Sequence, residues 1–255
     1  MAEELKIEYD AEYFDLVRSL TPISQSICFR KVKENPEDDS SADLIKVLRC
    51  NKAKSIFFKL MAPADKFTFN GDDEGEIAFL DFSGFHKAMS TFAPATLVQK
   101  GNNIQIKSQT GNINYRLSIP SSLMKAPKNI DLEDPDLEFN LSAETLSELA
   151  KASDLVKAEF ANILFEDGRL IIRLFNSIHG HSFDKEFHTE TVGSDLKDFV
   201  FTIKSEIISR LPIDNYKVKV RSGGHLAFCF NRPNGLELMV FTSRLRNVEA
   251  EKSNG

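Results

Sequence analysis

Two histidines one residue apart are the side chains in this sequence that come nearest to a chemical centre. His179 and His181 lie in the segment IHGHSF, and His188 follows shortly after them. The HxH spacing can bring two imidazoles to one metal ion, but a catalytic zinc ion needs a third protein ligand, which folding would have to supply. Histidines at the surface of a strand are the favoured interpretation. A metal-dependent enzyme that uses His179 and His181 is the least favoured alternative.

Other residue patterns that carry chemistry are missing from the sequence. It has no GxGxxG or GxxxxGK[ST] pattern to cradle a phosphate group, and no GxSxG nucleophile pattern. Its three cysteines, Cys28, Cys50 and Cys229, form no CxxC pair, and their odd number fits a reducing compartment. We therefore expect no catalytic activity, no cofactor and no metal.

The composition is that of a globular protein with a core rich in phenylalanine. The 255 residues include 21 Phe and no Trp, 42% are hydrophobic, and the formal net charge is −6. No stretch approaches the roughly 20 apolar residues of a membrane span. The start, MAEELKIEYD, lacks the basic and then apolar pattern of a signal peptide. We expect a cytoplasmic protein with no membrane partner.

Four helices are predicted at regular intervals, and segments with strand pattern lie between them. The helices fall at 11–20, 80–93, 143–153 and 204–212, so that successive helices are about 60 to 70 residues apart. One helix with its strands is too small to bury its own apolar face. Two copies are therefore expected to pair within one domain.

A Pro-rich segment at 120–136, PSSLMKAPKNIDLEDPD, separates two similar halves and is predicted to be an interdomain connector. The halves are residues 1–119 and 137–247, and residues 248–255 are predicted to form a flexible tail. The predicted fold class is α+β. Each domain is expected to be a duplicated unit of one helix and an antiparallel sheet.

Each predicted helix offers at least one cation away from its apolar side. In helix 80–93, apolar side chains share one side at helical spacing, namely Phe82, Phe85, Met89 and Phe92, and Lys87 points roughly the opposite way. For any single cation, simple solvation of an outer helix face is the usual explanation. As a set on repeated helices, they would line one surface and contact phosphates without reading sequence. The candidate cations are Arg18, Lys87, Lys151, Lys204 and Arg210.

The second half of the chain resembles the DNA polymerase sliding clamps of T4-like bacteriophages, relatives of proliferating cell nuclear antigen. The resemblance runs from LEFNLSAETLSELAKASDLVKAEFANILFEDGRLIIRLFN through FVFTIKSEIISRLPIDNYKVKV. The first half supports it with FDLVRSLTPISQSICFRK, FLDFSGFHKAMSTFA and QKGNNIQIKSQTGNINYRL in the corresponding order. The loop at 34–43, ENPEDDSSAD, and the long connector depart from the phage pattern by insertion.

The resemblance implies a two-domain DNA-clamp fold that assembles as a homotrimeric ring, with the sheets outside and the helices inside. Such a ring encircles double-stranded DNA without sequence specificity and tethers the replicative DNA polymerase as a processivity factor. The implied partners are DNA, a DNA polymerase, a clamp-loader ATPase and further copies of the chain, with late-transcription factors as a further candidate class. The location would be the cytoplasm of the infected host cell if the protein is viral. In the family, the candidate cations would face DNA, Lys204 least securely.

The resemblance also implies a hydrophobic pocket beside the connector that accepts short peptides of polymerases and loaders. By position, its wall would include Leu123, Leu226, Val240 and Phe241. Leu123 and Met124 are an apolar pair in a polar segment, so something is expected to cover them. The runner-up function is an adaptor that keeps the clamp fold and binds proteins rather than DNA.

Overall fold

The structure is a computed structural model that describes residues 4–35, 37–38, 40–69, 75–127, 132, 134–189, 191–192 and 196–245. The chain divides into two compact units. The first comprises Met1–Lys128 and Asn231–Leu238, and the second comprises Asn129–Phe230 and Met239–Gly255. The predicted tail, 248–255, lies outside the described residues. Among the described helices, none is both long and apolar enough to cross a membrane.

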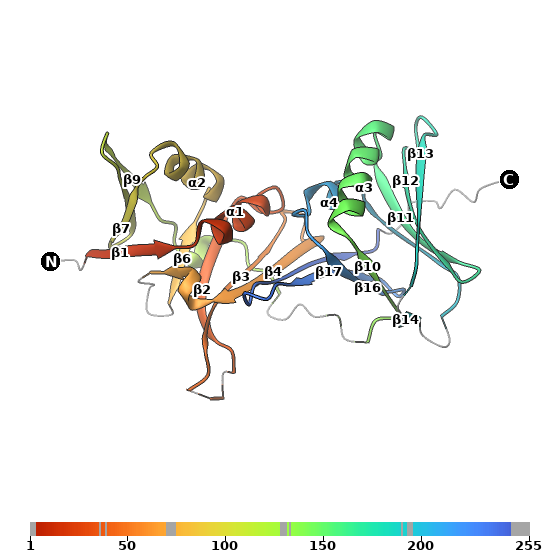
Figure 1. Ribbon diagram of the computed structural model, residues 1–255, viewed down its shortest axis with the longest axis horizontal. Helices are drawn as coiled ribbons and strands as arrows, with labels where there is room; N and C mark the ends of the chain where they lie inside the picture. The colour runs from red at the N-terminus through yellow and green to blue at the C-terminus, as the bar shows by residue number, and fades with distance from the viewer. Residues whose placement is uncertain are drawn as a thin grey trace. The chain divides into compact units, whose positions relative to one another are not determined.

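The first unit alternates helices with short strands, as Figure 1 shows from the N-terminus onward. Two 3-10 turns, η1 (Ala64–Lys66) and η2 (Pro120–Ser122), complete it. Its main elements are β1 (Glu4–Tyr9), α1 (Ala11–Ser19), β2 (Ile27–Lys33), β3 (Asp43–Cys50), β4 (Ile56–Pro63), β5 (Phe67–Thr68), β6 (Glu76–Phe79), α2 (Phe82–Thr91), β7 (Thr96–Lys100), β8 (Asn103–Lys107) and β9 (Asn112–Arg116).

The second unit follows the same plan, in which a strand leads into a helix and further strands return from it. Its elements are β10 (Leu137–Leu141), α3 (Ala143–Val156), β11 (Phe160–Glu166), β12 (Arg169–Phe175), β13 (Ser182–Phe187), β14 (Thr191–Val192), β15 (Phe199–Lys204), α4 (Glu206–Arg210), β16 (Tyr216–Arg221), β17 (His225–Asn231) and β18 (Glu237–Ser243).

The two repeats inside each unit exchange their first strands. In the first unit, β1 precedes α1 but pairs antiparallel with β7, and β6 precedes α2 but pairs with β2. In the second unit, β10 pairs with β16 and β15 pairs with β11 in the same way. Each repeat thus supplies one strand to the sheet of its neighbour. This arrangement confirms the predicted α+β fold of duplicated helix-and-sheet units.

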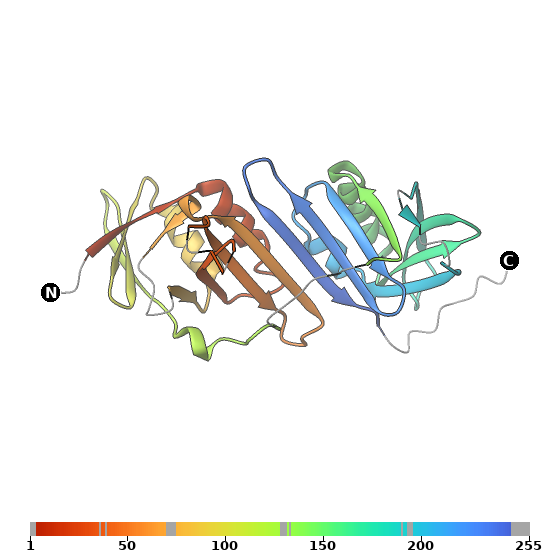
Figure 2. The same cartoon turned by 90° about the horizontal axis from the view of Figure 1, so that it is seen from below.

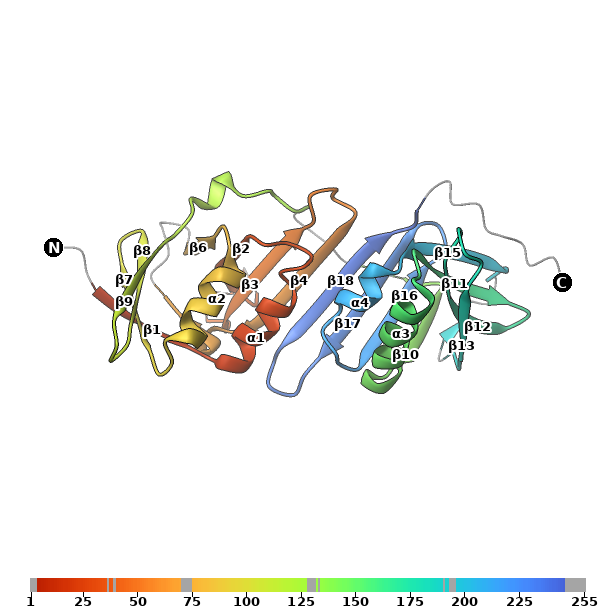
Figure 3. The same ribbon diagram turned by 90° about the horizontal axis from the view of Figure 1, so that it is seen from above.

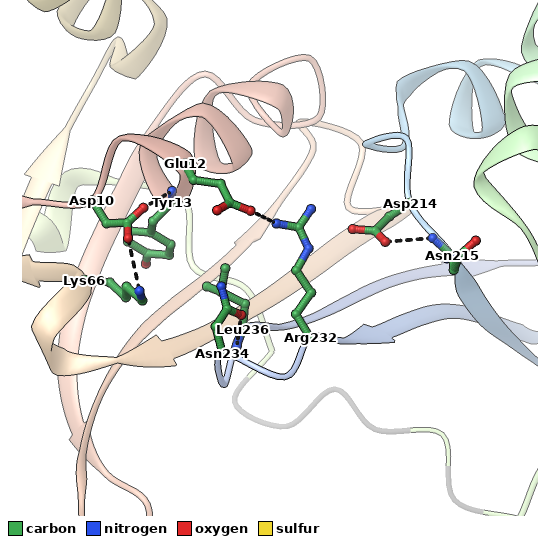
Figure 4. Close-up of polar contacts among 9 residues, drawn as sticks. All are labelled: Asp10, Glu12, Tyr13, Lys66, Asp214, Asn215, Arg232, Asn234 and Leu236. Carbon is green, nitrogen blue, oxygen red and sulfur yellow. Dashed lines mark hydrogen bonds and ion pairs between the residues drawn. The ribbon is translucent and has the colours of Figure 1, made fainter.

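Side-chain caps fix where the helices begin. Asp10 Oδ1 accepts a hydrogen bond from Tyr13 N at 2.9 Å (Figure 4), and Asp81 Oδ1 accepts one from Gly84 N at the same distance. Ser142 Oγ accepts one from Thr145 N at 3.1 Å. Each cap satisfies an amide that the first helical turn leaves without a partner. The three longer helices therefore start next to Asp10, Asp81 and Ser142.

The core of the first unit is a cluster of phenylalanine rings packed between the helices and the strands. Phe29 and Phe67 have ring centroids 4.7 Å apart, and Phe14 lies 5.0 Å from Phe67 and 5.5 Å from Phe82. All four side chains are fully buried. Many of these pairs are tilted or edge-on, which suits the charge distribution of aromatic rings. The Phe-rich core predicted from composition is confirmed here.

The helices of each unit cover one face of its main sheet, as Figures 1 and 3 show. Burial alternates along the strands beneath them: Ile56, Phe58, Leu60 and Ala62 of β4 are buried, and the intervening residues are half-buried. Figure 2 views the opposite faces, on which no described helix packs. Each main sheet therefore has a core face and an outer face.

Two sequence-based assignments need correction. The predicted helix at 204–212 is shorter, because Lys204 is the last residue of β15 and α4 spans Glu206–Arg210. The run FVFTIK pairs along its length with β11, which holds Lys204 extended opposite Phe160. The strands β1, β6 and β13 were not predicted, although β1, ELKIEY, alternates polar and apolar residues as a half-buried strand does. The four residues of β6 are too few to give a clear periodic signal.

Replacing Tyr13 by phenylalanine is expected to stabilise the protein. The Oη atom of Tyr13 is buried and has no hydrogen-bond partner among the described residues, and burial raises the pKa of this phenol. Removing an unpaired buried hydroxyl should raise the free energy of unfolding by about 1 kcal/mol. Urea denaturation measures this change.

Tyr216→Phe is the matched control, because Tyr216 Oη donates a hydrogen bond to Pro212 O at 2.8 Å. This variant should lower the free energy of unfolding by about 1 kcal/mol. Equal losses in the two variants would contradict the assignment of Tyr13 as unpaired.

Candidate functional surface

The exposed surface of α1 and α2 carries two predicted cations of the first unit. Tyr13, Phe14 and Val17 turn inward from α1, which leaves Arg18 exposed in its last turn. Phe82, Phe85 and Met89 turn inward from α2, which leaves Lys87 exposed. The predicted apolar side of α2 is confirmed at these three residues. Arg18 and Lys87 therefore belong to the solvent side of a helix pair.

Carboxylates on the same helix pair are held in ion pairs. Glu12 of α1 pairs with Arg232, which comes from the late segment of the first unit (Figure 4). Asp15 Oδ1 lies 3.0 Å from Nε2 of His86 on α2. Burial lowers the pKa of His86, an effect that Asp15 opposes and Arg18 reinforces. At neutral pH this contact joins a carboxylate to a largely neutral imidazole.

The helices of the second unit also carry exposed cations together with carboxylates that are held in ion pairs. Lys151 is exposed on α3, whose buried side contains Leu146 and Leu149. Glu148, also on α3, pairs with Lys185 of β13 at 2.7 Å. On α4, Arg210 pairs with Glu206 one turn earlier at 3.1 Å. Arg210 is therefore partly neutralised within its own helix, whereas Lys151 is not.

Counting charges along the four helices shows why pairing matters. Within the helix bounds there are four cations and six carboxylates. Glu12, Glu148 and Glu206 are paired with cations, and Asp15 contacts His86. In the part of the chain that the structure describes, Arg18, Lys87 and Lys151 make no ion pair. The cations are Arg18, Lys87, Lys151 and Arg210, and the carboxylates are Glu12, Asp15, Glu144, Glu148, Asp154 and Glu206.

Lys204 has a different environment from the other predicted cations. It ends β15, and its Nζ atom lies 4.5 Å from the ring centroid of Phe160, its register partner on β11. This cation–π contact holds the ammonium group over an aromatic ring at the surface. The placement of Lys204 on a helix was wrong, although its side chain is exposed.

The start of the predicted connector is attached to the first unit. Leu123 is buried, with 5% of its surface exposed, whereas Met124 is 40% exposed. Arg49, a buried residue of β3, donates a hydrogen bond from Nη1 to Met124 O at 2.9 Å. Cys50 Sγ lies 3.9 Å from Lys125 O. The expectation that this apolar pair is covered is confirmed for Leu123.

The other residues predicted to line a peptide pocket belong to the second unit. Leu226 and Val240 are fully buried on the core face of their sheet. Phe241 is half-buried, and its ring centroid lies 5.2 Å from that of His225. Of these three, Phe241 is thus the side chain with surface to offer a ligand. The position of the pocket stays a prediction.

The histidines that suggested a metal site lie in the turn between β12 and β13. His179 and His181 are exposed, and their ring centroids are 6.2 Å apart. Asn176 Oδ1 accepts hydrogen bonds from Ile178 N and His179 N, which organises the turn. The described residues contain no group of three His, Cys, Asp or Glu side chains that could hold a metal ion. The metal-dependent alternative therefore lacks a third ligand among them.

Each unit described above, with exchanged first strands and two helices on one sheet face, has the architecture of the DNA sliding-clamp fold. The chain is similar over 95% of its length to PCNA from Thermococcus kodakaraensis, with a TM-score of 0.67, 14% identity and 100% of that chain covered. Proliferating Cellular Nuclear Antigen from Entamoeba histolytica gives a TM-score of 0.69, 13% identity, and coverage of 96% of this chain and 100% of that chain.

A third similar structure is A. fulgidus PCNA bound to the C-terminal region of FEN-1, with a TM-score of 0.68, 14% identity, and coverage of 95% and 99%. Neither a protein-family model nor a curated protein sequence matches the chain. The structural likeness establishes the clamp fold across the chain. The resemblance to the clamps of T4-like bacteriophages in particular stays a prediction.

The contact between His86 and Asp15 predicts a pH dependence of stability. Because folding lowers the pKa of His86, the unfolded chain binds a proton more readily. The free energy of unfolding should therefore be constant above the unfolded pKa of about 6.5 and decrease as the pH falls below it. Urea denaturation between about pH 7.5 and pH 5 measures this decrease.

His86→Gln removes the titrating group and should make this part of the pH profile flatter than that of the parent protein. His225→Gln is the control, because His225 is exposed and belongs to β17 in the second unit. Identical slopes for the parent and His86→Gln would contradict a contribution from His86.

Proposed function

We propose that the protein is a sliding clamp, a ring of three copies that encircles duplex DNA and tethers the replicative DNA polymerase. The observation that carries this proposal is the clamp fold over 95% of the chain. Three helix cations that make no ion pair with any described residue support it, namely Arg18, Lys87 and Lys151. A catalytic centre has no part in this function, since the clamp acts by enclosure.

The chemistry of DNA retention follows from enclosure combined with weak phosphate contacts. A closed ring keeps its DNA topologically, so that few favourable contacts are needed. Cations that contact phosphates add affinity without reading sequence, and such contacts allow sliding. Pairing of the nearby carboxylates leaves Arg18, Lys87 and Lys151 able to make them. Opening such a ring would need a separate clamp-loader ATPase.

Protein partners form the second part of the proposal. The A. fulgidus PCNA structure holds the C-terminal region of FEN-1, and a Sulfolobus tokodaii structure holds a PCNA2–PCNA3 complex. By analogy, we expect this chain to bind peptide segments of a polymerase and a loader, beside the connector that Arg49 anchors. Late-transcription factors are a further candidate class. The exposed Met124 of the connector is the side chain we propose for peptide contact.

Closing a ring of identical copies requires that a sheet edge of one copy pairs with a different sheet edge of the next. Each unit has one edge strand that suits this role. In the first unit β9 is the last strand of its sheet, and Ile113 and Tyr115 share one side of it. In the second unit β13 is the last strand of its sheet, and Phe183 and Phe187 share one side. The two edges differ in charge, with Arg116 on β9 and two carboxylates against one lysine on β13. We propose that β9 of one copy pairs with β13 of the next.

A protein-binding adaptor with the clamp fold is the second candidate function. The observation that favours it is the excess of carboxylates on the helices, six against four cations, which gives a weak field for DNA. An adaptor would bind peptides as a clamp does, but would not depend on Arg18, Lys87 or Lys151.

The proposed ring predicts the mass of the protein in solution. Light scattering should give about three times the chain mass of 28.7 kDa. Ile113→Asp on β9 and Phe183→Asp on β13 should each abolish the trimer, because a carboxylate at the paired edge would be desolvated. A stable trimer in either variant would contradict the assigned edges.

Mixing these two variants sharpens the test of the edges. The Ile113→Asp chain keeps an intact β13, and the Phe183→Asp chain keeps an intact β9. The mixture should therefore form a species of two chains, although neither variant associates alone. A mixture that stays monomeric would contradict the proposal that β9 of one copy pairs with β13 of another.

Reversing the helix cations should separate a clamp from an adaptor. Arg18→Glu, Lys87→Glu and Lys151→Glu in one chain should reduce processive synthesis on primed circular DNA at least about tenfold, because repulsion replaces phosphate contacts. Peptide binding should be unchanged. The control reverses three exposed cations away from the helices, Lys6, Arg169 and Lys197. Undiminished synthesis by the helix variant would favour the adaptor.

A further inference from the structure

The outer face of the first unit is the face of β2, β3, β4 and β6 that lies opposite α1 and α2. Residues of these strands alternate between the core and this face, since Ile45 and Val47 are buried and Lys46 and Leu48 are half-buried. Figure 2 views this face, which no described α-helix covers. Its side chains are therefore available to a partner.

Strand register places the charged side chains of the outer face in one row. Arg30 of β2 pairs in register with Glu76 of β6 on one side and with Lys46 of β3 on the other. Lys46 in turn pairs with Met61 of β4. The row across the sheet is thus Glu76, Arg30, Lys46 and Met61. A third cation, Lys59, lies on β4 two residues from Met61 on the same face.

Apolar side chains flank this charged row on both sides. On one side, Leu44 of β3 pairs with Val32 and with Pro63. On the other side, Leu48 of β3 pairs with Lys59. Val32, Leu44, Leu48 and Met61 are all half-buried, so each keeps part of its apolar surface in water. The outer face therefore has a charged row between two rows that hold apolar side chains, and Lys59 lies in the row of Leu48.

The three cations on this face, Arg30, Lys46 and Lys59, repel one another. Among the described residues, one of the three is paired with a carboxylate. Arg30 forms an ion pair with the buried carboxylate of Glu76. Lys46 and Lys59 make no ion pair within the described part of the chain. Burial lowers the pKa of Lys46, and the charges of Lys59 and Arg30 add to this effect. Like charges directly opposite in a sheet are destabilising, so folding alone gives no reason for this cluster.

The second unit shows the same preference on its own outer face. Lys217, Lys219 and Arg221 lie on one side of β16, and Glu138 of β10 pairs with Lys217 at 2.8 Å. Three cations and one carboxylate thus occupy this face of β10 and β16, as they do on the outer face of the first unit. The helices, by contrast, carry more carboxylates than cations. The uncovered sheet faces are the basic surfaces of this chain.

We propose that the outer face of the first unit binds an extended acidic segment of a partner protein, whose carboxylates pair with Lys46 and Lys59 and whose apolar side chains cover Leu44, Leu48 and Met61. The complementarity of charge and of apolar rows identifies this partner chemistry. The site is separate from the helix surfaces, and the connector contacts the end of the same strand, β3, at Arg49 and Cys50. The proposal does not depend on the protein being a clamp.

A nucleic acid fits this face less well than an acidic peptide. Proteins that hold single strands stack the bases on exposed aromatic rings. Among the described outward side chains of β2, β3, β4 and β6, the one aromatic ring is that of half-buried Phe57. The rows of aliphatic side chains would stay in contact with water beneath a phosphate backbone, whereas leucine-like side chains would cover them.

Fluorescence anisotropy with the full-length chain tests the proposal. The probe is a labelled peptide of alternating glutamate and leucine, compared with peptides in which glutamine replaces glutamate or serine replaces leucine. We expect binding of the first peptide, weakening as salt is added, and much weaker binding of the other two. Equal binding of all three peptides would overturn the proposal. A labelled oligothymidine that binds more tightly than the first peptide would overturn it as well.

Neutral variants locate the binding on the outer face. Lys46→Gln with Lys59→Gln should weaken binding of the glutamate–leucine peptide about tenfold, since two charge pairs are lost. The melting temperature should stay the same or rise, because like-charge repulsion is relieved. Lys6→Gln with Lys197→Gln is the matched control and should bind the peptide normally. Unchanged binding by the first variant, or an equal loss in the control, would overturn the proposal.

Leu48→Gln tests the apolar row independently of the charges. It should weaken binding of the glutamate–leucine peptide but leave binding of the glutamate–serine peptide unchanged. An equal effect on both peptides would show that the apolar row makes no contact and would overturn its part in the proposal.

Discussion

Each main sheet in this protein buries one face under two helices and leaves the other face in water, and most other features depend on this constraint. It requires strands whose residues alternate between core and outer face, as β4 does from Ile56 to Pro63. It also requires helices with one apolar side, such as the side of α2 that holds Phe82, Phe85 and Met89. Three kinds of surface result: a closed core, a helix surface and an outer sheet face.

Charge is distributed unevenly over these surfaces. The net charge of −6 does not predict where cations gather. On the helices, ion pairs such as Glu148 with Lys185 neutralise carboxylates while Lys87 and Lys151 are left unpaired. On the outer face of the first unit, Lys46 and Lys59 stay unpaired among the described residues because Glu76 is engaged by Arg30. Pairing thus leaves cations available on a helix surface that carries more carboxylates than cations, whereas the outer face is positive through composition.

Sequence reasoning predicted the helices and hairpins well where local signals are strong. The Asp-Gly turn after β11 is confirmed by positive φ angles of 49° at Asp167 and 75° at Gly168. Ser142 caps α3 as its position suggested. Lys204 was misplaced because a short helix follows a strand without a side-chain cap at Ser205, so the boundary has no clear local signal. Long-range pairings such as β1 with β7 leave no trace in local sequence.

The exchange of first strands has a consequence for how the chain folds as it is made. Lys6 of β1 pairs with Val98 of β7, so synthesis must continue for 92 further residues (98 − 6) before β1 finds its partner. Until then β1 has only the short pairing of Glu8 and Tyr9 with β5, and the rest of this strand is an open edge that favours association with other chains. Pairing over such a sequence separation also makes folding slow. The two repeats of a unit therefore cannot mature one after the other, and the smallest part of this chain that can fold is a whole unit.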